Sequence, residues 1–303
     1  MRLNTIAISH LEKVFNRKKK ALNNINLHIH NGMFGILGRN GSGKSTLMNI
    51  LSTLIPATKG EVTINNISIK ETKKIRRIIG YLPQDFDFYP NMKVSEVLYY
   101  LGFLSKINQT DFDKYVDLIL RKVNLIDYKN KKVKSLSGGM KKRLGIAQAI
   151  LHDPKVIIVD EPTAGLDPEE RVRLRNLLSD LAENKIVIIS THIVSDIEST
   201  CNRIAILDKG SLVYKGDIPS LIQQSDDHIY EINLSPSELE SFRENDLFIT
   251  KTQEIENKLK VRFISETKVA NAKKVKADFE DAYMYFLKKQ QGGLNHASIY
   301  NGI

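Results

Sequence analysis

The segment Gly38–Thr46 is the part of the sequence whose residue types and spacing point most directly to chemistry. It fits the pattern G-x-x-x-x-G-K-[ST], with an apolar run before it and a helical run after it. In this pattern glycines let the backbone turn closely around phosphate groups and present N–H donors to them. We expect Lys44 to bridge the β- and γ-phosphates of a triphosphate and the Ser45 hydroxyl to coordinate Mg²⁺. The candidate phosphate-binding residues are Gly38, Arg39, Asn40, Gly41, Ser42, Gly43, Lys44, Ser45 and Thr46.

Two adjacent carboxylates, Asp160 and Glu161, follow the apolar run 156–159. Four consecutive β-branched residues predict a buried strand that delivers both carboxylates at its carboxyl end. We expect Asp160 to hold Mg²⁺ and Glu161 to polarise the water that attacks the γ-phosphate. A surface helix cap is the other interpretation, since Pro162 follows, but such a cap does not need an apolar strand before it.

These residues need a scaffold that brings them together. Up to about residue 215, short apolar runs alternate with amphipathic stretches, which predicts an α/β architecture with a largely parallel sheet. A hairpin turn is predicted at Asn65-Asn66, because asparagine tolerates a positive φ. Strands at the N-terminal edge are predicted at residues 6–15, 21–30 and 61–70.

Two further regions lie beside this sheet. Residues 86–151 are mostly helical in pattern and predict a helical insertion within a first domain that spans residues 1–224. After that the pattern changes to alternating strands, which predicts a small α+β accessory domain at 225–290. Its last element is predicted to be a helix at 279–290, and residues 291–303 are predicted to be a disordered tail.

Composition excludes several classes of protein. The chain has 303 residues, of which 42% are hydrophobic and 26% charged, as in an ordinary globular protein. No apolar run approaches the ~18–20 residues of a membrane-spanning helix, and the N-terminus has no secretory pattern. The single cysteine, Cys201, excludes a disulfide framework and indicates a reducing compartment.

The net charge of +10 arises within residues 1–224, because residues 225–303 carry slightly more acidic than basic side chains. Solubility alone explains such an excess. A polyphosphate substrate, anionic headgroups or nucleic acid would each explain it as well. The charge does not choose among these partners.

Other short segments narrow the interpretation. Residues 136–140 read Leu-Ser-Gly-Gly-Met at the start of a predicted helix, and Thr191-His192 follows the predicted strand 186–190. With these segments the chain resembles the ATP-binding subunits of ABC transporters over about residues 1–220. The resemblance implies a P-loop NTPase core of ABC ATPase type, with an antiparallel β edge subdomain and a helical insertion, plus a small C-terminal α+β extension.

The resemblance also implies roles for single residues. Gln84 matches the Q-loop glutamine and His192 the switch histidine, so the implied catalytic residues are Glu161, His192 and Gln84. The implied Mg²⁺ ligands are Ser45, Gln84 and Asp160.

The remaining nucleotide contacts come from outside the phosphate loop. Phe15 matches the aromatic residue that stacks on adenine, and Asp167 matches the D-loop aspartate. Residues 136–140 match the LSGGQ signature, with Met140 in place of the usual glutamine. The signature residues implied to contact phosphate are Ser137, Gly138 and Gly139.

The signature predicts a dimer. Ser137 and the N–H groups that follow it open a helix, which makes a second anion site in a chain that already has a phosphate loop. A second site is useful only if it closes on the ATP of another molecule. The resemblance implies two copies in a head-to-tail arrangement with two ATP molecules between them. Because Glu161, His192 and the signature are all present in this chain, the prediction is a homodimer.

Function beyond ATP hydrolysis must come from partners. The first hypothesis is a subunit that powers a separate membrane permease and lies at the cytoplasmic face of the membrane through it, with no nucleic acid as partner. The alternative is a soluble ABC-type ATPase of DNA repair or translation, disfavoured because the chain has one ATPase unit and no heptads between Lys44 and Ser137. A small-molecule kinase is disfavoured by the signature and Thr191-His192.

Three segments resemble the export branch of the family, which serves drug, antimicrobial-peptide, lipid or polymer exporters. These segments are residues 32–51, 79–101 and 279–289. In addition, the aromatic cluster Phe86, Phe88, Tyr89 and Pro90 follows Gln84. It either packs locally into the helical insertion or forms a docking surface for a short permease helix.

Overall fold

The computed structural model describes residues 3–16, 19–107, 110–243, 247–256 and 258–290. The chain divides into two compact units, Met1–Leu212 and Val213–Ile303. The division falls inside strand β10 (Ser211–Asp217), whereas residue 224 lies near the end of helix α8 (Ile218–Ser225). The tail 291–303, predicted to be disordered, lies outside the described residues.

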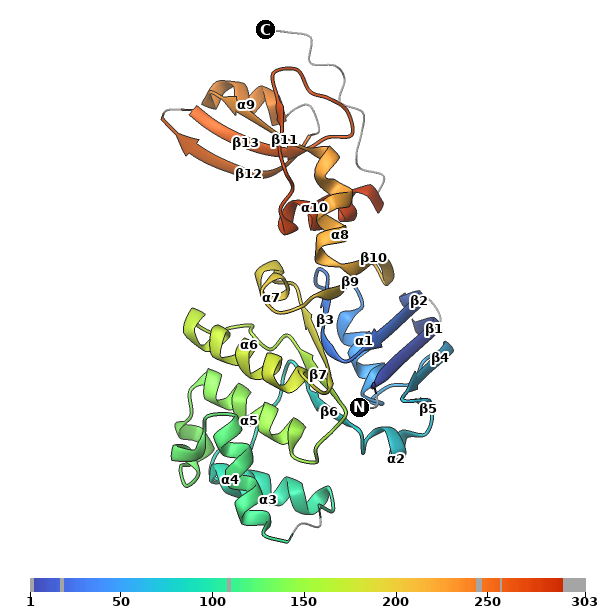
Figure 1. Ribbon diagram of the computed structural model, residues 1–303, viewed down its shortest axis with the longest axis vertical. Helices are drawn as coiled ribbons and strands as arrows, with labels where there is room; N and C mark the ends of the chain where they lie inside the picture. Colours follow the sequence, from blue (N-terminus) through green and yellow to red (C-terminus); the bar gives the residue numbers. More distant parts are fainter. Residues whose placement is uncertain (1–2, 17–18, 108–109, 244–246, 257, 291–303) are drawn as a thin grey trace. The chain divides into compact units, whose positions relative to one another are not determined.

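The first unit is built on a sheet with strand order β10-β9-β3-β8-β7-β6 (Figure 1). Strands β3, β6, β7, β8 and β9 pair in parallel, which confirms the predicted parallel sheet. Because β3, β8 and β7 are neighbours, their carboxyl ends meet at one edge of the sheet. Their bounds are β3 (Gly32–Leu37), β6 (Ile79–Leu82), β7 (Val156–Asp160), β8 (Ile186–Thr191) and β9 (Arg203–Asp208).

The first four residues of strand β7, 156–159, are all apolar because both faces of the sheet are covered. Ile157 and Val159 pack into a core shared with the helices that follow β6, and Val156 and Ile158 pack into a second core with α1 and the edge strands. The helices of this unit are α1 (Lys44–Leu51), α2 (Thr72–Ile75), α3 (Val94–Leu104), α4 (Phe112–Lys122), α5 (Gly138–Ile150), α6 (Pro168–Ala182) and α7 (Val194–Glu198), with 3₁₀ turns at Ile126–Tyr128 and Val133–Ser135.

An antiparallel sheet of order β2-β1-β4-β5 covers the N-terminal edge, as predicted. Asn65 and Asn66 form the turn between β4 and β5 with φ values of 51° and 63°, the conformation that a tight hairpin requires. The strands are β1 (Thr5–Phe15), β2 (Lys19–His30), β4 (Lys59–Ile64) and β5 (Ile67–Ser68).

The second unit contains a sheet of order β12-β13-β11-β14 with a helix on each face. Phe242 of α9 packs into one apolar cluster, and Tyr285 of α10 packs into another. The elements are a 3₁₀ turn (Asp226–His228), β11 (Ile229–Leu234), α9 (Pro236–Arg243), β12 (Phe248–Ile255), β13 (Lys258–Ile264), β14 (Lys273–Lys274) and α10 (Phe279–Gln290).

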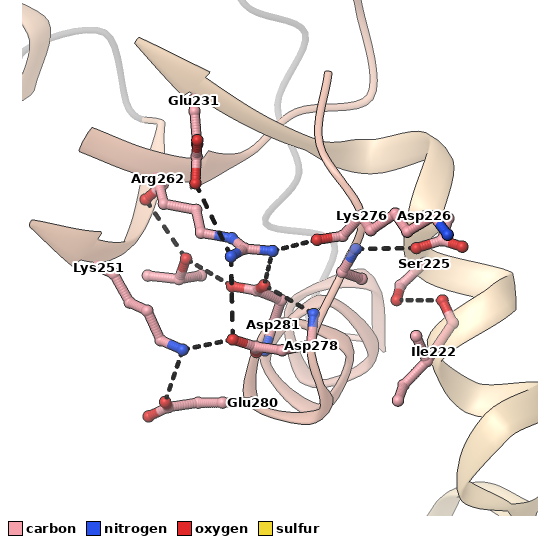
Figure 2. Close-up of polar contacts among 12 residues, drawn as sticks. Ile222, Ser225, Asp226, Glu231, Lys251, Arg262, Lys276, Asp278, Glu280 and Asp281 are labelled. Carbon is pink, nitrogen blue, oxygen red and sulfur yellow. Dashed lines mark hydrogen bonds and ion pairs between the residues drawn. The ribbon is translucent and has the colours of Figure 1, made fainter. Parts of the chain in front are cut away.

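A polar network fixes the start of α10 in this unit (Figure 2). Asp278 and Asp281 accept each other's backbone N–H at 2.9 and 3.0 Å, which forms a reciprocal cap of the helix. Arg262 lies on β13. Its guanidinium is 2.7 Å from the carboxylate of Asp281, which is fully buried at the start of α10, and 3.8 Å from the carboxylate of Glu231 on β11. The network therefore ties β13 and β11 to α10.

Candidate functional site

The phosphate loop leads from β3 into α1 through a left-handed glycine. Gly43 has φ +108° and caps α1, and a Cβ at this position would lie 2.7 Å from the carbonyl oxygen of Ala21. Only glycine satisfies both conditions. The turn between β9 and β10 braces the loop, because the N–H of Gly210 donates to the carbonyl of Ser42 at 2.9 Å.

One cavity of ≈ 830 Å³ brings together several of the predicted site residues. Phe15, Gln84 and Glu161 line it together with the phosphate loop. The loop residues that line it are Asn40, Gly41, Gly43, Lys44, Ser45 and Thr46, and the other lining residues are Asn16, Lys19, Lys20, Ala21, Lys209 and Gly210. Residues from five separate parts of the sequence thus surround one polyphosphate-sized space.

Three lysines that line this cavity, Lys19, Lys20 and Lys209, are not among the site residues predicted from the sequence. Lys20 pairs with Glu12 across the edge sheet at 3.1 Å. The basic excess of residues 1–224 was a signal for them, but charge alone does not tell which lysines share a cavity. Their positive charge suits an anionic ligand.

Phe15 lies at the end of β1 and is 38% exposed at the cavity. The Nζ of Lys13 lies 4.9 Å from the centre of the Phe15 ring and also donates to the carbonyl of Pro56 at 2.7 Å. The ammonium over the ring is a cation–π contact that orients the side chain. A partly exposed, oriented aromatic ring can stack on a nucleobase.

Glu161 is the buried carboxylate of the cavity, and it is held in a strained conformation. Its φ is +48°, which costs about 1–3 kcal/mol for a residue with a side chain. Its Oε1 lies 3.5 Å from the Nζ of Lys44, and its Oε2 lies 3.0 Å from the Nδ1 of His192. Lys44 also donates to the carbonyl of Gly38 at 2.7 Å. A cation and an imidazole thus orient one carboxylate beside the phosphate loop.

We expect His192→Ala to lower kcat about 100-fold while KM for ATP stays close to the wild-type value. Nδ1 contacts Glu161, so the imidazole orients the carboxylate and leaves the phosphate loop intact. Steady-state ATPase kinetics separate the two constants. The matched control is His30→Ala, since His30 is exposed at the end of β2. An unchanged kcat in His192→Ala would make this histidine a surface residue.

The three predicted Mg²⁺ ligands all supply oxygen donors, the type that Mg²⁺ prefers. Ser45 and Gln84 are exposed at the cavity, while Asp160 is 2% exposed and accepts a hydrogen bond from the Ser190 hydroxyl. The donor set therefore fits the ion. Burial, followed by the charge of Asp160, raises the pKa of Tyr81 to about 12, so this neighbouring hydroxyl stays neutral.

The signature and Asp167 do not line the described cavity. Ser137 caps α5, where its Oγ accepts the N–H of Met140 at 3.2 Å, and Asp167 caps α6, where its Oδ1 accepts the N–H of Glu170 at 2.9 Å. Both segments begin helices, where the backbone N–H groups of the first turn are available as donors. One chain thus carries both a phosphate loop and a second set of backbone N–H donors at the signature, and the fold keeps the signature away from the cavity at the phosphate loop.

The comparisons with known proteins agree with this arrangement. A family model described as "ABC transporter" matches residues 22–164. The chain is 34% identical to the uncharacterized ABC transporter ATP-binding protein YxlF of Bacillus subtilis over 77% of this chain and 78% of that protein. It is 35% identical to the linearmycin resistance ATP-binding protein LnrL of the same organism, over 66% of this chain and 65% of that protein.

A solved structure is similar as well. The dimeric, post-hydrolysis structure of the ATP-binding cassette MJ0796 bound to ADP and Pi matches with a TM-score of 0.63 and 31% identity. The match covers 70% of this chain and 98% of that one. These comparisons give no support to the alternative of a DNA-repair ATPase.

Proposed function

Because this chain belongs to the ABC transporter family, as an ATP-binding subunit with ATPase activity, we propose that it powers a separate membrane permease. No helix in the described ranges is long and apolar enough to cross a membrane. Binding to that permease would hold the subunit at the cytoplasmic face of the membrane. The observation that carries the proposal is an exposed apolar groove beside Gln84.

The groove has a volume of ≈ 640 Å³ and is lined by β6 and the loop after it, by helices α3 and α5, and by the segment that follows α1. Tyr89, Leu54 and Tyr100 line it and are 66%, 58% and 46% exposed. Phe86 and Phe88 pack edge to face, 5.5 Å apart, against the core of the helical insertion. The aromatic cluster therefore divides into two packing residues and one exposed tyrosine, which suits a short amphipathic helix of the permease.

We expect Tyr89→Ala to abolish the stimulation of ATPase activity by the permease and leave the basal activity of the isolated subunit unchanged. An exposed aromatic ring in a docking groove contributes mostly to binding, about 2 kcal/mol or more at a hot spot. The measurement compares ATPase rates of the subunit alone and of the subunit co-expressed with a permease encoded beside its gene.

Phe103→Ala is the matched control. Phe103 is an 81% exposed aromatic residue on the same helix as Tyr100, but it does not line the groove. If Phe103→Ala uncouples as strongly as Tyr89→Ala, the groove is not the specific contact. If Tyr89→Ala lowers the basal activity too, Tyr89 serves local packing and the docking proposal fails.

We propose further that the catalytic unit is a head-to-tail homodimer. Its support is the separation of the signature from the cavity of the same chain, together with the dimeric state of the similar MJ0796 cassette. In such a dimer Ser137 and the N–H groups of Gly138 and Gly139 would face the ATP held by the phosphate loop of the other subunit.

In the proposed mechanism each side chain has a separate task. Lys44 and the backbone N–H groups of the loop bind the β- and γ-phosphates, and Phe15 stacks on the base. Glu161, oriented by His192, accepts a proton from the attacking water. Bound Mg²⁺ would supply charge neutralisation at the phosphate oxygens, held by Ser45, Asp160 and Gln84.

We propose export as the direction of transport. The similarity to a protein named for linearmycin resistance supports a substrate such as an antimicrobial, a drug, a lipid or a polymer. The export-like segments 32–51, 79–101 and 279–289 support the same direction. The permease selects the substrate, so the ATPase subunit carries no specificity for it.

A further inference from the structure

The two signature glycines have different surroundings. A Cβ added to Gly138 would meet no atom within 4 Å, whereas a Cβ on Gly139 would lie 2.5 Å from the Oε2 of Glu170 and 2.8 Å from its Cγ. Gly138 thus faces open space, from which a phosphate can approach. Gly139 faces the first turn of α6 in the same chain, so its lack of a side chain serves packing within the subunit.

Arg143 holds the carboxylate that packs against Gly139. Its Nε lies 3.3 Å from the Oε2 of Glu170, and its Nη2 lies 3.5 Å from Oε1. The two side chains are only 7% and 13% exposed. A buried pair of this kind keeps its geometry, because either charge alone would be costly in that place.

The same guanidinium reaches the end of α4. Its Nη1 donates to the carbonyls of Val123 and Asn124 at 3.1 and 2.7 Å. Arginine suits this position because its planar, forked head makes several hydrogen bonds at fixed angles. One side chain on α5 therefore connects the ends of α4 and α6 to the helix that begins with the signature.

Glu170 has a second connection through its backbone. Its N–H donates to the Oδ1 of Asp167, the capping residue of α6. In the usual capping box the carboxylate three residues after the cap turns back to the cap's own N–H. Here the carboxylate contacts Arg143 and, on its exposed side, Arg173 instead. Glu170 therefore fixes Asp167 with its backbone and the signature helix with its side chain.

We propose that Arg143 and Glu170 are positioning residues of the ATPase reaction, which hold the signature and Asp167 in one arrangement toward the ATP of a second subunit. The proposal rests on the head-to-tail dimer proposed above. Neither residue lines the described cavity of its own chain. They therefore act on the site of the other subunit through Ser137, Gly138 and Asp167.

We expect Arg143→Met and Glu170→Ala each to lower ATPase activity about 10- to 100-fold, the effect of a small misplacement of a contacting group. ATP affinity, measured by calorimetric titration, stays unchanged, because the phosphate loop of the same chain is intact. Circular dichroism and thermal unfolding check the fold. If Arg143→Met does not fold, Glu170→Ala carries the test, since an alanine there leaves Arg143 its two carbonyl partners.

Mixing experiments distinguish positioning in trans from a general structural defect. Each positioning variant is mixed with Lys44→Ala, which has an intact signature. Mixed dimers then contain one complete site, formed by the phosphate loop of the positioning variant and the signature of the Lys44→Ala subunit. We expect the ATPase activity of the mixture to exceed clearly the sum of the two separate activities.

Ser137→Arg mixed with Lys44→Ala is the control for the dimer itself. If this control mixture gains no activity, the head-to-tail dimer proposal fails. If the control gains activity and the mixtures with Arg143→Met and Glu170→Ala do not, the positioning inference is overturned, because the defect then lies within the variant's own site.

Two further variants test the contact directly. Arg173→Gln removes a 48% exposed partner of the same Glu170 carboxylate and should leave activity unchanged. Gly139→Ala is expected to displace Glu170, so the double variant Gly139→Ala/Glu170→Ala should lose no more ATPase activity than Glu170→Ala alone. Losses that multiply in the double variant would show that Gly139 and Glu170 act independently and would overturn the inference.

Discussion

Glu161→Gln is expected to lower kcat for ATP hydrolysis about 100- to 1,000-fold, while ATP still binds. Glutamine has the shape of the carboxylate side chain and can keep its contact to His192, but it cannot accept a proton from water. Glu161 is buried, 4% exposed, and lies between Lys44 and His192, which orient its carboxylate. Steady-state ATPase assays measure the loss.

The same variant tests the dimer. With hydrolysis blocked, the proposed ATP-bound dimer should accumulate, and light scattering after gel filtration should show twice the monomer mass with ATP but not with ADP. Glu169→Gln on the surface of α6 is the matched control, since Glu169 is 75% exposed. Near-normal turnover in Glu161→Gln would remove this residue from the catalytic role. If Glu161→Gln loses turnover but forms no dimer with ATP, the head-to-tail dimer is contradicted, while the catalytic role of Glu161 stands.

Lys44→Ala is expected to weaken ATP binding about 10- to 100-fold, which corresponds to the loss of a charged hydrogen bond of about 1.5–3 kcal/mol. Lys44 is 5% exposed and its Nζ lies at the phosphate loop, 2.7 Å from the carbonyl of Gly38. Alanine leaves the phosphate oxygens without this cation and leaves the nearby Glu161 carboxylate unopposed, so both binding and turnover fall. Calorimetric titration with ATP measures the affinity.

Lys74→Ala is the control for Lys44→Ala. Lys74 is a surface lysine that pairs with Glu71 and does not line the cavity. Its removal should change ATP affinity very little. If the Lys44→Ala variant is folded and binds ATP as tightly as the wild type, Lys44 does not contact the phosphates.

Much of the fold could be predicted because its signals are local. The apolar run 156–159 is a strand, the pair Asn65-Asn66 is a hairpin turn, and the segment 279–290 is a helix, as the sequence predicted. Each of these depends on side-chain periodicity or on a φ value that few residues adopt. The helix α8 was not predicted, and the division of the chain inside β10 depends on which residues pack together rather than on a change of composition.

The sequence by itself determined which residues are the candidates for the chemistry of the site. The spacing in Gly38–Thr46 and the position of Asp160-Glu161 after a buried strand follow from local requirements, namely close approach of a backbone to phosphate and burial of an apolar strand. The order of β3, β8 and β7 then explains why these segments meet. Parallel strands place their carboxyl ends at a common edge.

Only the tertiary structure decided how these residues contact one another. Tyr89 is exposed while Phe88, one residue before it, packs inward, and Gly138 faces open space while Gly139 faces Glu170. The sequence presents each pair as equivalent neighbours. Their difference arises because contacts form between residues far apart in the chain, and these depend on the packing of helices against one another rather than on any periodicity within a segment.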